Sequence, residues 1–115
     1  MTFQQFKDKY QDYLVTVRRR FHESPELSME EKETSRFIVS EVEACGLPYE
    51  MAGDYGVIAV VQGTKPGTGR NVLLRADIDA LPIQEDANNL VGPKNSCSKV
   101  SGVGHLCGHD AHRAM

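Results

Sequence analysis

The segment from His105 to His112 holds the densest group of possible metal ligands in the sequence. Five of its eight residues are His, Cys or Asp side chains that can bind or orient a metal ion. Thiolate and imidazole together suit divalent transition metals, and the softness of the thiolate favours zinc. Gly108 allows a tight turn between Cys107 and His109, so both side chains can converge on one ion. The segment therefore predicts a divalent-metal site, and a helix beginning near Asp110 would stabilise the thiolate through its dipole.

Two alternatives to this site remain open from the residues alone. In the first, Cys107 is a buried free thiol beside surface histidines that cap a helix, which is the commoner role of an isolated Cys-x-His pair. In the second, Cys97, Cys107, His109 and His112 form a small metal-binding or interaction module without catalysis. Their spacing suits a structural zinc site poorly, because such sites generally take their ligands as two separated pairs.

Two acidic residues, Asp77 and Asp79, follow the apolar run at 72–74. At alternate positions of a continuing strand, both carboxylates would point the same way. Acids at the carboxyl end of a strand in an open α/β sheet are candidates for binding a metal or supporting its ligands. The structural alternative is that Arg75 neutralises one Asp while the other caps the following turn.

A basic run, Arg18-Arg19-Arg20, lies shortly before His22. Such a run could bind phosphate, but near a helix C-terminus it more simply complements the helix dipole. We interpret His22 as a structural residue rather than a metal ligand.

Composition excludes several classes of protein. The 115 residues include 13 Lys and Arg against 16 Asp and Glu, a net charge of −3. A dedicated nucleic-acid binder normally carries a basic excess, so nucleic acid is not an expected partner. No apolar run reaches the ~18–20 residues of a membrane span, and the first residues do not resemble a secretory signal. We therefore expect a cytoplasmic protein whose Cys45, Cys97 and Cys107 form no disulfides.

Helical periodicity dominates the first 45 residues. The apolar residues from Phe3 to Phe21 follow one helical stripe, and Pro25 ends or follows that helix. A second helix is expected to begin at Ser28, where Glu31 would complete a capping box, and Gly46 suits the left-handed position that ends a helix. The apolar face of this second helix would comprise Phe37, Ile38, Val42 and Cys45.

Short apolar runs replace the helical pattern after Pro48. Residues 49–52, 57–61 and 72–74 are expected to be strands, the last two buried on both faces, although antiparallel pairing remains open. The turn-rich residues 63–69 would join the last two runs as a hairpin connection. Residues 82–104 lack a regular pattern, and loops of that length are usually functional or disordered. Residues 108–114 are typical of the opening of a helix, so we expect the N-terminal part of a longer protein.

Three segments, in this order, resemble one enzyme family. They are residues 22–27 with Glu33 and Thr34, residues 74–83, and residues 105–112. They are similar to the signature segments of the amidohydrolase branch of the aminoacylase–carboxypeptidase metallopeptidases. That branch includes hippurate hydrolase, N-acetyldiaminopimelate deacetylase and the indoleacetyl-amino-acid hydrolases. The resemblance runs from about Arg18 to Met115.

The resemblance implies a hydrolase that cleaves the amide bond of N-acyl amino acids with two divalent metal ions (Zn, Mn, Co or Ni) per active site. Cys107 and His109 match metal ligands of the family, and Asp110 or His112 would orient them. Asp79 matches the position of an acid that supports a ligand or acts in catalysis. Asp77 receives no ligand role, because related peptidases carry a His there. The family's general-base Glu and further ligands match no residue of this chain.

The implied fold class is α/β. Residues 1–115 would be the N-terminal part of an α/β/α catalytic domain, with two helices, then β-strands, then a long active-site loop that leads into a third helix. The rest of that domain and an inserted dimerisation domain would lie outside this chain. The resemblance therefore also implies a homodimeric full-length protein that acts on a small N-acyl-amino-acid substrate.

Overall fold

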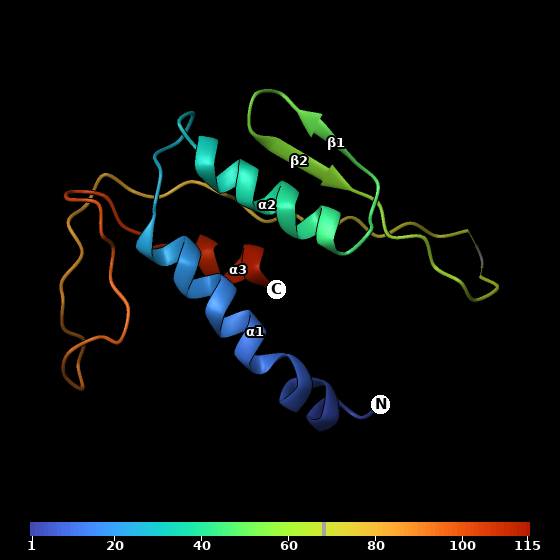
Figure 1. The fold of residues 1–115 in the computed structure, drawn as a ribbon, viewed down its shortest axis with the longest axis horizontal. Helices are drawn as coiled ribbons and strands as arrows, with labels where there is room; N and C mark the ends of the chain where they lie inside the picture. Colours follow the sequence, from blue (N-terminus) through green and yellow to red (C-terminus); the bar gives the residue numbers. More distant parts are fainter. Residues whose placement is uncertain (68) are drawn as a thin grey trace.

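A computed structural model describes residues 1–67 and 69–115 of the chain. Three helices and one hairpin follow in the order α1 (Phe3–Glu23), α2 (Lys32–Ala44), β1 (Tyr49–Ala52), β2 (Gly56–Ala59) and α3 (His109–Ala114). In Figure 1, α2 lies along the hairpin, whereas α3 packs against α1. The predicted α/β class is confirmed, as is the order of two helices, strands, a long loop and a third helix.

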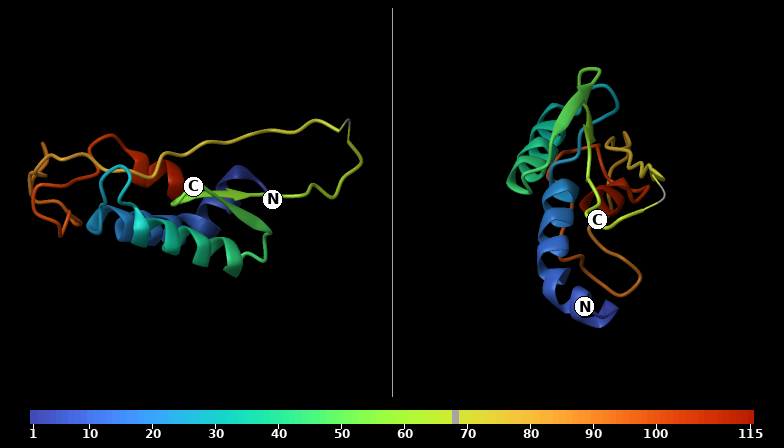
Figure 2. Two further views of the ribbon diagram at one scale, coloured as in Figure 1. Left: turned by 90° about the horizontal axis from the view of Figure 1, so that it is seen from above. Right: turned by 90° about the vertical axis from the view of Figure 1, so that its right-hand side faces the viewer.

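Helix α1 forms where the apolar stripe predicts it. Thr2 and Gln5 cap its start reciprocally, each accepting a hydrogen bond from the other's backbone N–H. Only the C-terminal half of the stripe is buried, because Val17 and Phe21 pack in the core while Phe3 stays exposed. The elongated shape of the molecule in Figure 2 includes this projecting N-terminal half of α1.

The predicted start of the second helix at Ser28 is wrong. Helix α2 begins at Lys32, and Met29 adopts a left-handed conformation with φ 68°. The carboxylate of Glu26 accepts the backbone N–H groups of Glu33 (3.0 Å) and Thr34 (2.5 Å), so a residue from before the turn caps the helix. A local Ser-x-x-Glu box is therefore unnecessary here.

The end of α2 matches the sequence more closely than its start. Gly46 has φ 68°, and the backbone N–H of Leu47 bonds the carbonyl of Val42 at 3.2 Å, which is a left-handed helix ending as predicted. The prediction that Cys45 lies on the apolar face is wrong, because its side chain is exposed.

The strands predicted at 49–52 and 57–61 are confirmed, although the second covers Gly56–Ala59. The two strands pair with each other. β1 and β2 are antiparallel, with Tyr49 opposite Ala59 and Ala52 opposite Gly56. Burial on both faces is wrong for the second run, because Ile58 is 44% exposed. β1 is exposed along its length and β2 is exposed at its last two residues, as an antiparallel hairpin at the surface allows.

The predicted strand at 72–74 is wrong, and so is its hairpin with 57–61. Val72, Leu73 and Leu74 are 85–89% exposed, and they join no strand among residues 1–67 and 69–115. Apolar side chains favour a strand only where a neighbouring backbone supplies hydrogen bonds. The connection predicted at 63–69 includes Thr68, which lies outside the described residues.

The core joins all three helices. Val17 and Phe21 of α1 cluster with Phe37 of α2, and Ala114 of α3 packs on that cluster. The rings of Phe21 and Phe37 lie 4.9 Å apart, while the guanidinium of Arg113 lies 4.2 Å from the Phe21 ring centre. These contacts seat the short helix α3 on α1 and thereby fix where its first residue, His109, is placed.

The long irregular connection at 82–104 is confirmed, and hydrogen bonds hold it in place. Leu81 pairs with Gly104 at its two ends, and the backbone N–H of Lys99 bonds the carbonyl of Glu23 at 2.9 Å.

Of the helices in the described part of the chain, none has the length and apolar character required to cross a bilayer.

Candidate functional site

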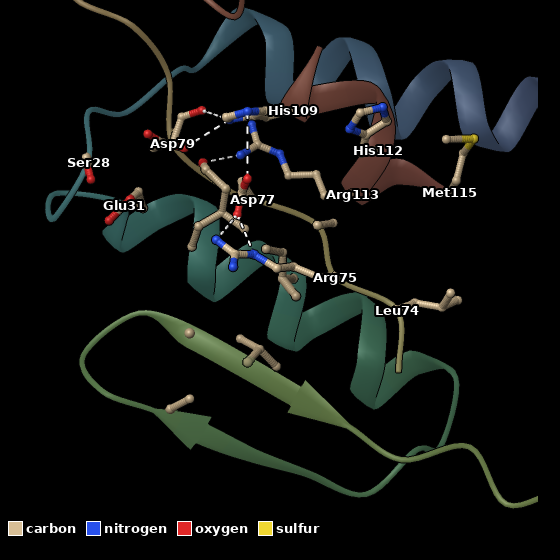
Figure 3. Close-up of a pocket in the computed structure, with 16 residues that line it drawn as sticks. Ser28, Glu31, Leu74, Arg75, Asp77, Asp79, His109, His112, Arg113 and Met115 are labelled. Carbon is tan, nitrogen blue, oxygen red and sulfur yellow. Dashed lines mark hydrogen bonds and ion pairs between the residues drawn. The ribbon is translucent and has the colours of Figure 1, made fainter. Parts of the chain in front are cut away.

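His109 and Asp79, two of the residues singled out from the sequence, contact each other directly (Figure 3). The Nδ1 atom of His109 lies 2.9 Å from Oδ1 of Asp79 and 3.0 Å from the Asp79 backbone oxygen. Both partners are acceptors, so this geometry assigns the proton to Nδ1 and leaves the lone pair on Nε2. Metal-binding histidines typically donate their other ring N–H to a carboxylate or carbonyl in this way.

Asp77 lies near the same imidazole but is engaged elsewhere. Its Oδ2 atom is 4.0 Å from Nε2 of His109, while its Oδ1 atom pairs with the Arg75 guanidinium at 2.8 Å. The structural alternative for this segment is thus correct for Asp77, which Arg75 neutralises. It is not correct for Asp79, whose carboxylate contacts His109 and not the following turn.

Cys107 is exposed, two residues before His109. Gly108 between them has φ 80° and precedes the first turn of α3, so the predicted backbone turn is confirmed. Exposure also excludes the alternative of a buried Cys107 thiol. An accessible thiol and an imidazole with a free Nε2 fit the donor set of a divalent transition metal.

Two ligands are fewer than a metal ion requires. Across residues 1–67 and 69–115, no three His, Cys, Asp or Glu side chains come together as a group that could hold a metal. The four-residue module of Cys97, Cys107, His109 and His112 is accordingly not assembled. The Cys97 thiol instead lies 4.0 Å from the carbonyl of Ala87.

A broad open cavity of about 1210 Å³ adjoins His109 (Figure 3). Its wall is formed by α2, the hairpin, residues 74–79 and α3. Asp77, Asp79, His109 and the exposed His112 all line it, but Cys107 does not. The acid pair and two of the predicted histidines therefore stand on one concave surface that solvent reaches.

A buried network of charged residues fixes the base of α3. The Nδ1 and Nε2 atoms of His22 each lie 2.8 Å from a carboxylate oxygen, of Asp110 and Glu85 respectively. Arg18 also donates to Asp110, at 2.7 Å. The guanidinium of Arg18 also lies 3.1 Å from the same Nδ1 atom, so His22 joins α1, α3 and the loop at 82–104 through buried polar contacts. His22 is thus structural, as interpreted from the sequence.

Asp110 has a different role from the one expected. Its side chain is 1% exposed and binds His22 and Arg18, and no described hydrogen bond joins it to Cys107 or His109. The carboxylate that contacts His109 directly is that of Asp79. Asp110 instead anchors the helix on which His109 stands.

Glu85 is a member of this buried network that no sequence pattern indicated. Burial alone raises the pKa of its carboxyl, but the backbone N–H of Ser98, the Lys94 ammonium and His22 outweigh burial and lower that pKa to about 2. Glu85 lies in a loop without periodicity, 63 residues from His22, so neither spacing nor pattern could have indicated the contact.

His105 stands behind the site without an anionic partner. Burial and the nearby Arg113 charge lower its pKa to about 4. Arg113 donates to its Nε2, so the neutral ring carries its proton on Nδ1, which has no partner in the described part of the chain. Arg113 also donates to the carbonyl of Ile78 and so holds residues 77–79 against α3.

Known proteins resemble this chain in both sequence and fold. A Bacillus subtilis protein named as an amidohydrolase, YhaA, is 46% identical over 102 residues, which are 88% of this chain and 24% of that protein. The IAA-amino acid hydrolase ILR1-like 5 of Arabidopsis thaliana is 41% identical over 109 residues, 95% of this chain and 23% of the relative. No protein-family model matches the chain.

A solved structure is similar to this chain in both fold and sequence. The crystal structure of the Bacillus subtilis YxeP protein, described as a dinuclear metal binding peptidase of the M20 family, superposes with a TM-score of 0.76 at 38% identity. The match covers 93% of this chain and 29% of that one. The chain spans about a quarter of the length of the curated relatives it matches. Over nearly all of its residues the chain is similar in sequence and fold to amidohydrolases and to a peptidase of the M20 family.

Proposed function

We propose that the protein containing these residues is a metal-dependent hydrolase that cleaves the amide bond of N-acyl amino acids. The observation that carries the proposal is the His109–Asp79 pair, which holds the imidazole with Nε2 free, two residues from the accessible Cys107 thiol. The similarity to an IAA-amino acid hydrolase supports this substrate class. These residues would form part of a catalytic domain, with its remainder and an inserted dimerisation domain supplied by further chain.

Cys107 and His109 would hold a divalent metal ion together with ligands from outside these residues. When bound, the ion would supply water activation and carbonyl polarisation. Asp79 would keep the His109 ring in place and raise the basicity of Nε2 through the Nδ1 hydrogen bond. The His22–Asp110 contact would hold α3, and hence His109, against α1. The similarity to a dinuclear metal binding peptidase supports two ions per site.

The experiment is a deacylation assay of the complete protein with N-acetyl and N-benzoyl amino acids. We expect hydrolysis that a chelator abolishes and that Zn²⁺ or Mn²⁺ restores. Hydrolysis that persists in the chelated, metal-free protein would rule out metal dependence. Failure to cleave any N-acyl amino acid, with metal bound, would rule out the substrate class and leave the metal site standing.

A further inference from the structure

A second cavity, of about 430 Å³, lies between the C-terminal half of α1 and the loop at 85–106. It shares no lining residue with the cavity at His109. Its wall carries three cationic side chains, those of Arg18 and Arg19 from α1 and of Lys94 from the loop, and it also includes His22. Glu85 is the one carboxylate on this wall, and Asp110 stands behind it, in contact with Arg18 and His22.

The carboxylates neutralise only part of this charge. Asp110 pairs with Arg18 at 2.7 Å, and Glu85 pairs with Lys94 at 3.0 Å. His22 contacts the same two acids. Arg19 forms no ion pair with any described residue. Three permanently cationic side chains therefore line a wall that holds one carboxylate, with Asp110 behind it, and the net positive charge that remains is one a bound anion would balance.

The Arg18-Arg19-Arg20 run is therefore not explained by the helix dipole. Of the three, only Arg20 lies in the last turn of α1, and its guanidinium stacks 3.7 Å above the Phe37 ring. Arg18 serves the buried network through Asp110. Arg19 lines the cavity, and it forms no ion pair with any of the described residues.

Neutral donors complete the wall. The Oδ1 atom of Asn89 accepts the backbone N–H groups of Val91 (2.9 Å) and Gly92 (3.1 Å), which leaves its amide NH₂ to donate. His105 also lines the cavity and is 5% exposed. Its Nδ1 atom is one of two buried side-chain nitrogens, the other being Nε of Arg113, that lack a hydrogen-bond partner among residues 1–67 and 69–115. A buried donor without an acceptor destabilises the fold, and an anion oxygen that reached it would remove this penalty.

We propose that this cavity binds a small doubly charged oxyanion of the phosphate type, as the free ion or as a phosphate group of a small molecule. Arg19 and Lys94 supply the long-range attraction, while Asn89 and His105 offer N–H groups. The site is independent of the metal centre, since it uses none of the proposed ligands.

The test is calorimetric titration of the chelator-treated protein with inorganic phosphate at pH 7, with chloride held constant. We expect one phosphate per chain and at least tenfold weaker binding in Arg19→Gln, which removes a charge without disturbing a described contact. Arg19→Lys should retain most of the affinity. Arg36→Gln is the matched control, because Arg36 is an exposed arginine outside the cavity that pairs with Glu33 at 2.6 Å.

Parallel titrations with sulfate, acetate and a phosphomonoester identify the ligand. Sulfate binding with weak acetate binding supports a doubly charged oxyanion, and tighter binding of the monoester assigns a phosphate group on a small molecule. Acetate binding as tight as phosphate would overturn the phosphate class. No saturable phosphate binding, or equal binding by Arg19→Gln and Arg36→Gln, would overturn the site itself.

Discussion

The Nδ1 atom of His22 lies 2.8 Å from Oδ2 of Asp110, although the two residues are 88 positions apart in the sequence. The contact joins α1 to the base of α3, directly beside His109. Both side chains are almost fully buried, at 4% and 1% exposure. The placement of a candidate metal ligand therefore depends on an ion pair that has no direct part in binding the metal.

Replacing Asp110 by Asn should destabilise the fold substantially. The substitution leaves the buried His22 ring and Arg18 with one carboxylate fewer, and removing one partner of a buried pair costs about 3–5 kcal/mol. Chemical denaturation monitored by circular dichroism measures the loss. Glu33→Gln is the control, since it breaks the exposed pair with Arg36 and should cost about 0–1 kcal/mol. Equal effects of the two substitutions would contradict the network's role.

Stability should fall in acid partly through Glu85. Its folded-state pKa is about 2, below its ordinary value of 4.5, so the carboxylate contributes stability that is fully present above about pH 4.5. That contribution is lost as the pH falls toward 2. Denaturation midpoints from pH 6 to pH 2 should therefore fall more steeply in the wild type than in Glu85→Gln. Parallel curves for the two proteins would show that Glu85 is not the group involved.

The sequence was sufficient to predict those elements whose signals are local. The apolar stripe of α1, the left-handed Gly46 and the turn at Gly108 each follow from the residues at that position. The resemblance to a metallopeptidase family also implied that the Asp77–Asp79 segment and the Cys107–His109 segment belong to one site. The structure brings Asp79 and His109 together as that prediction requires.

Local sequence signals could not predict the contacts between residues that are distant in the chain. The cap of α2 comes from Glu26, so the Ser28 box predicted from neighbouring residues was wrong. Glu85 gathers His22, Lys94 and Ser98 from separate parts of the chain. A strand also needs a partner, which the apolar run at 72–74 does not find within the described residues. Tertiary contacts decided each of these cases.

Asp79→Asn and Asp77→Asn form a matched pair that tests the orienting role. Only Asp79 lies within hydrogen-bond distance of His109, so its substitution should lower metal affinity and deacylation by about 10–100-fold in the complete protein. Asp77→Asn should have a smaller effect, because that carboxylate pairs with the exposed Arg75. Metal titration and kinetic assays of both variants measure the difference. A larger loss for Asp77→Asn would reverse the assignment.

The isolated 115-residue chain should show no amidase turnover. It offers at most two of the proposed ligands, and it contains no residue matched to the family's general base. Its affinity for Zn²⁺ should likewise be weak, since two ligands form an incomplete shell. Equilibrium dialysis and an amidase assay check both statements. A stoichiometric, tightly held zinc released by Cys97→Ala would instead favour the four-residue Cys/His module.

The most direct measurement is the metal content and N-acyl-amino-acid hydrolysis of Cys107→Ala, His109→Ala and Cys45→Ala in the complete protein. Cys45 and Cys107 are both exposed free thiols, so Cys45→Ala controls for the loss of a surface thiol. Cys107→Ala and His109→Ala should each lose metal and activity while keeping the wild-type circular dichroism spectrum. Cys45→Ala should retain both. If Cys107→Ala matches Cys45→Ala, with full metal content and full activity, Cys107 is not a ligand and the proposed metal centre is wrong.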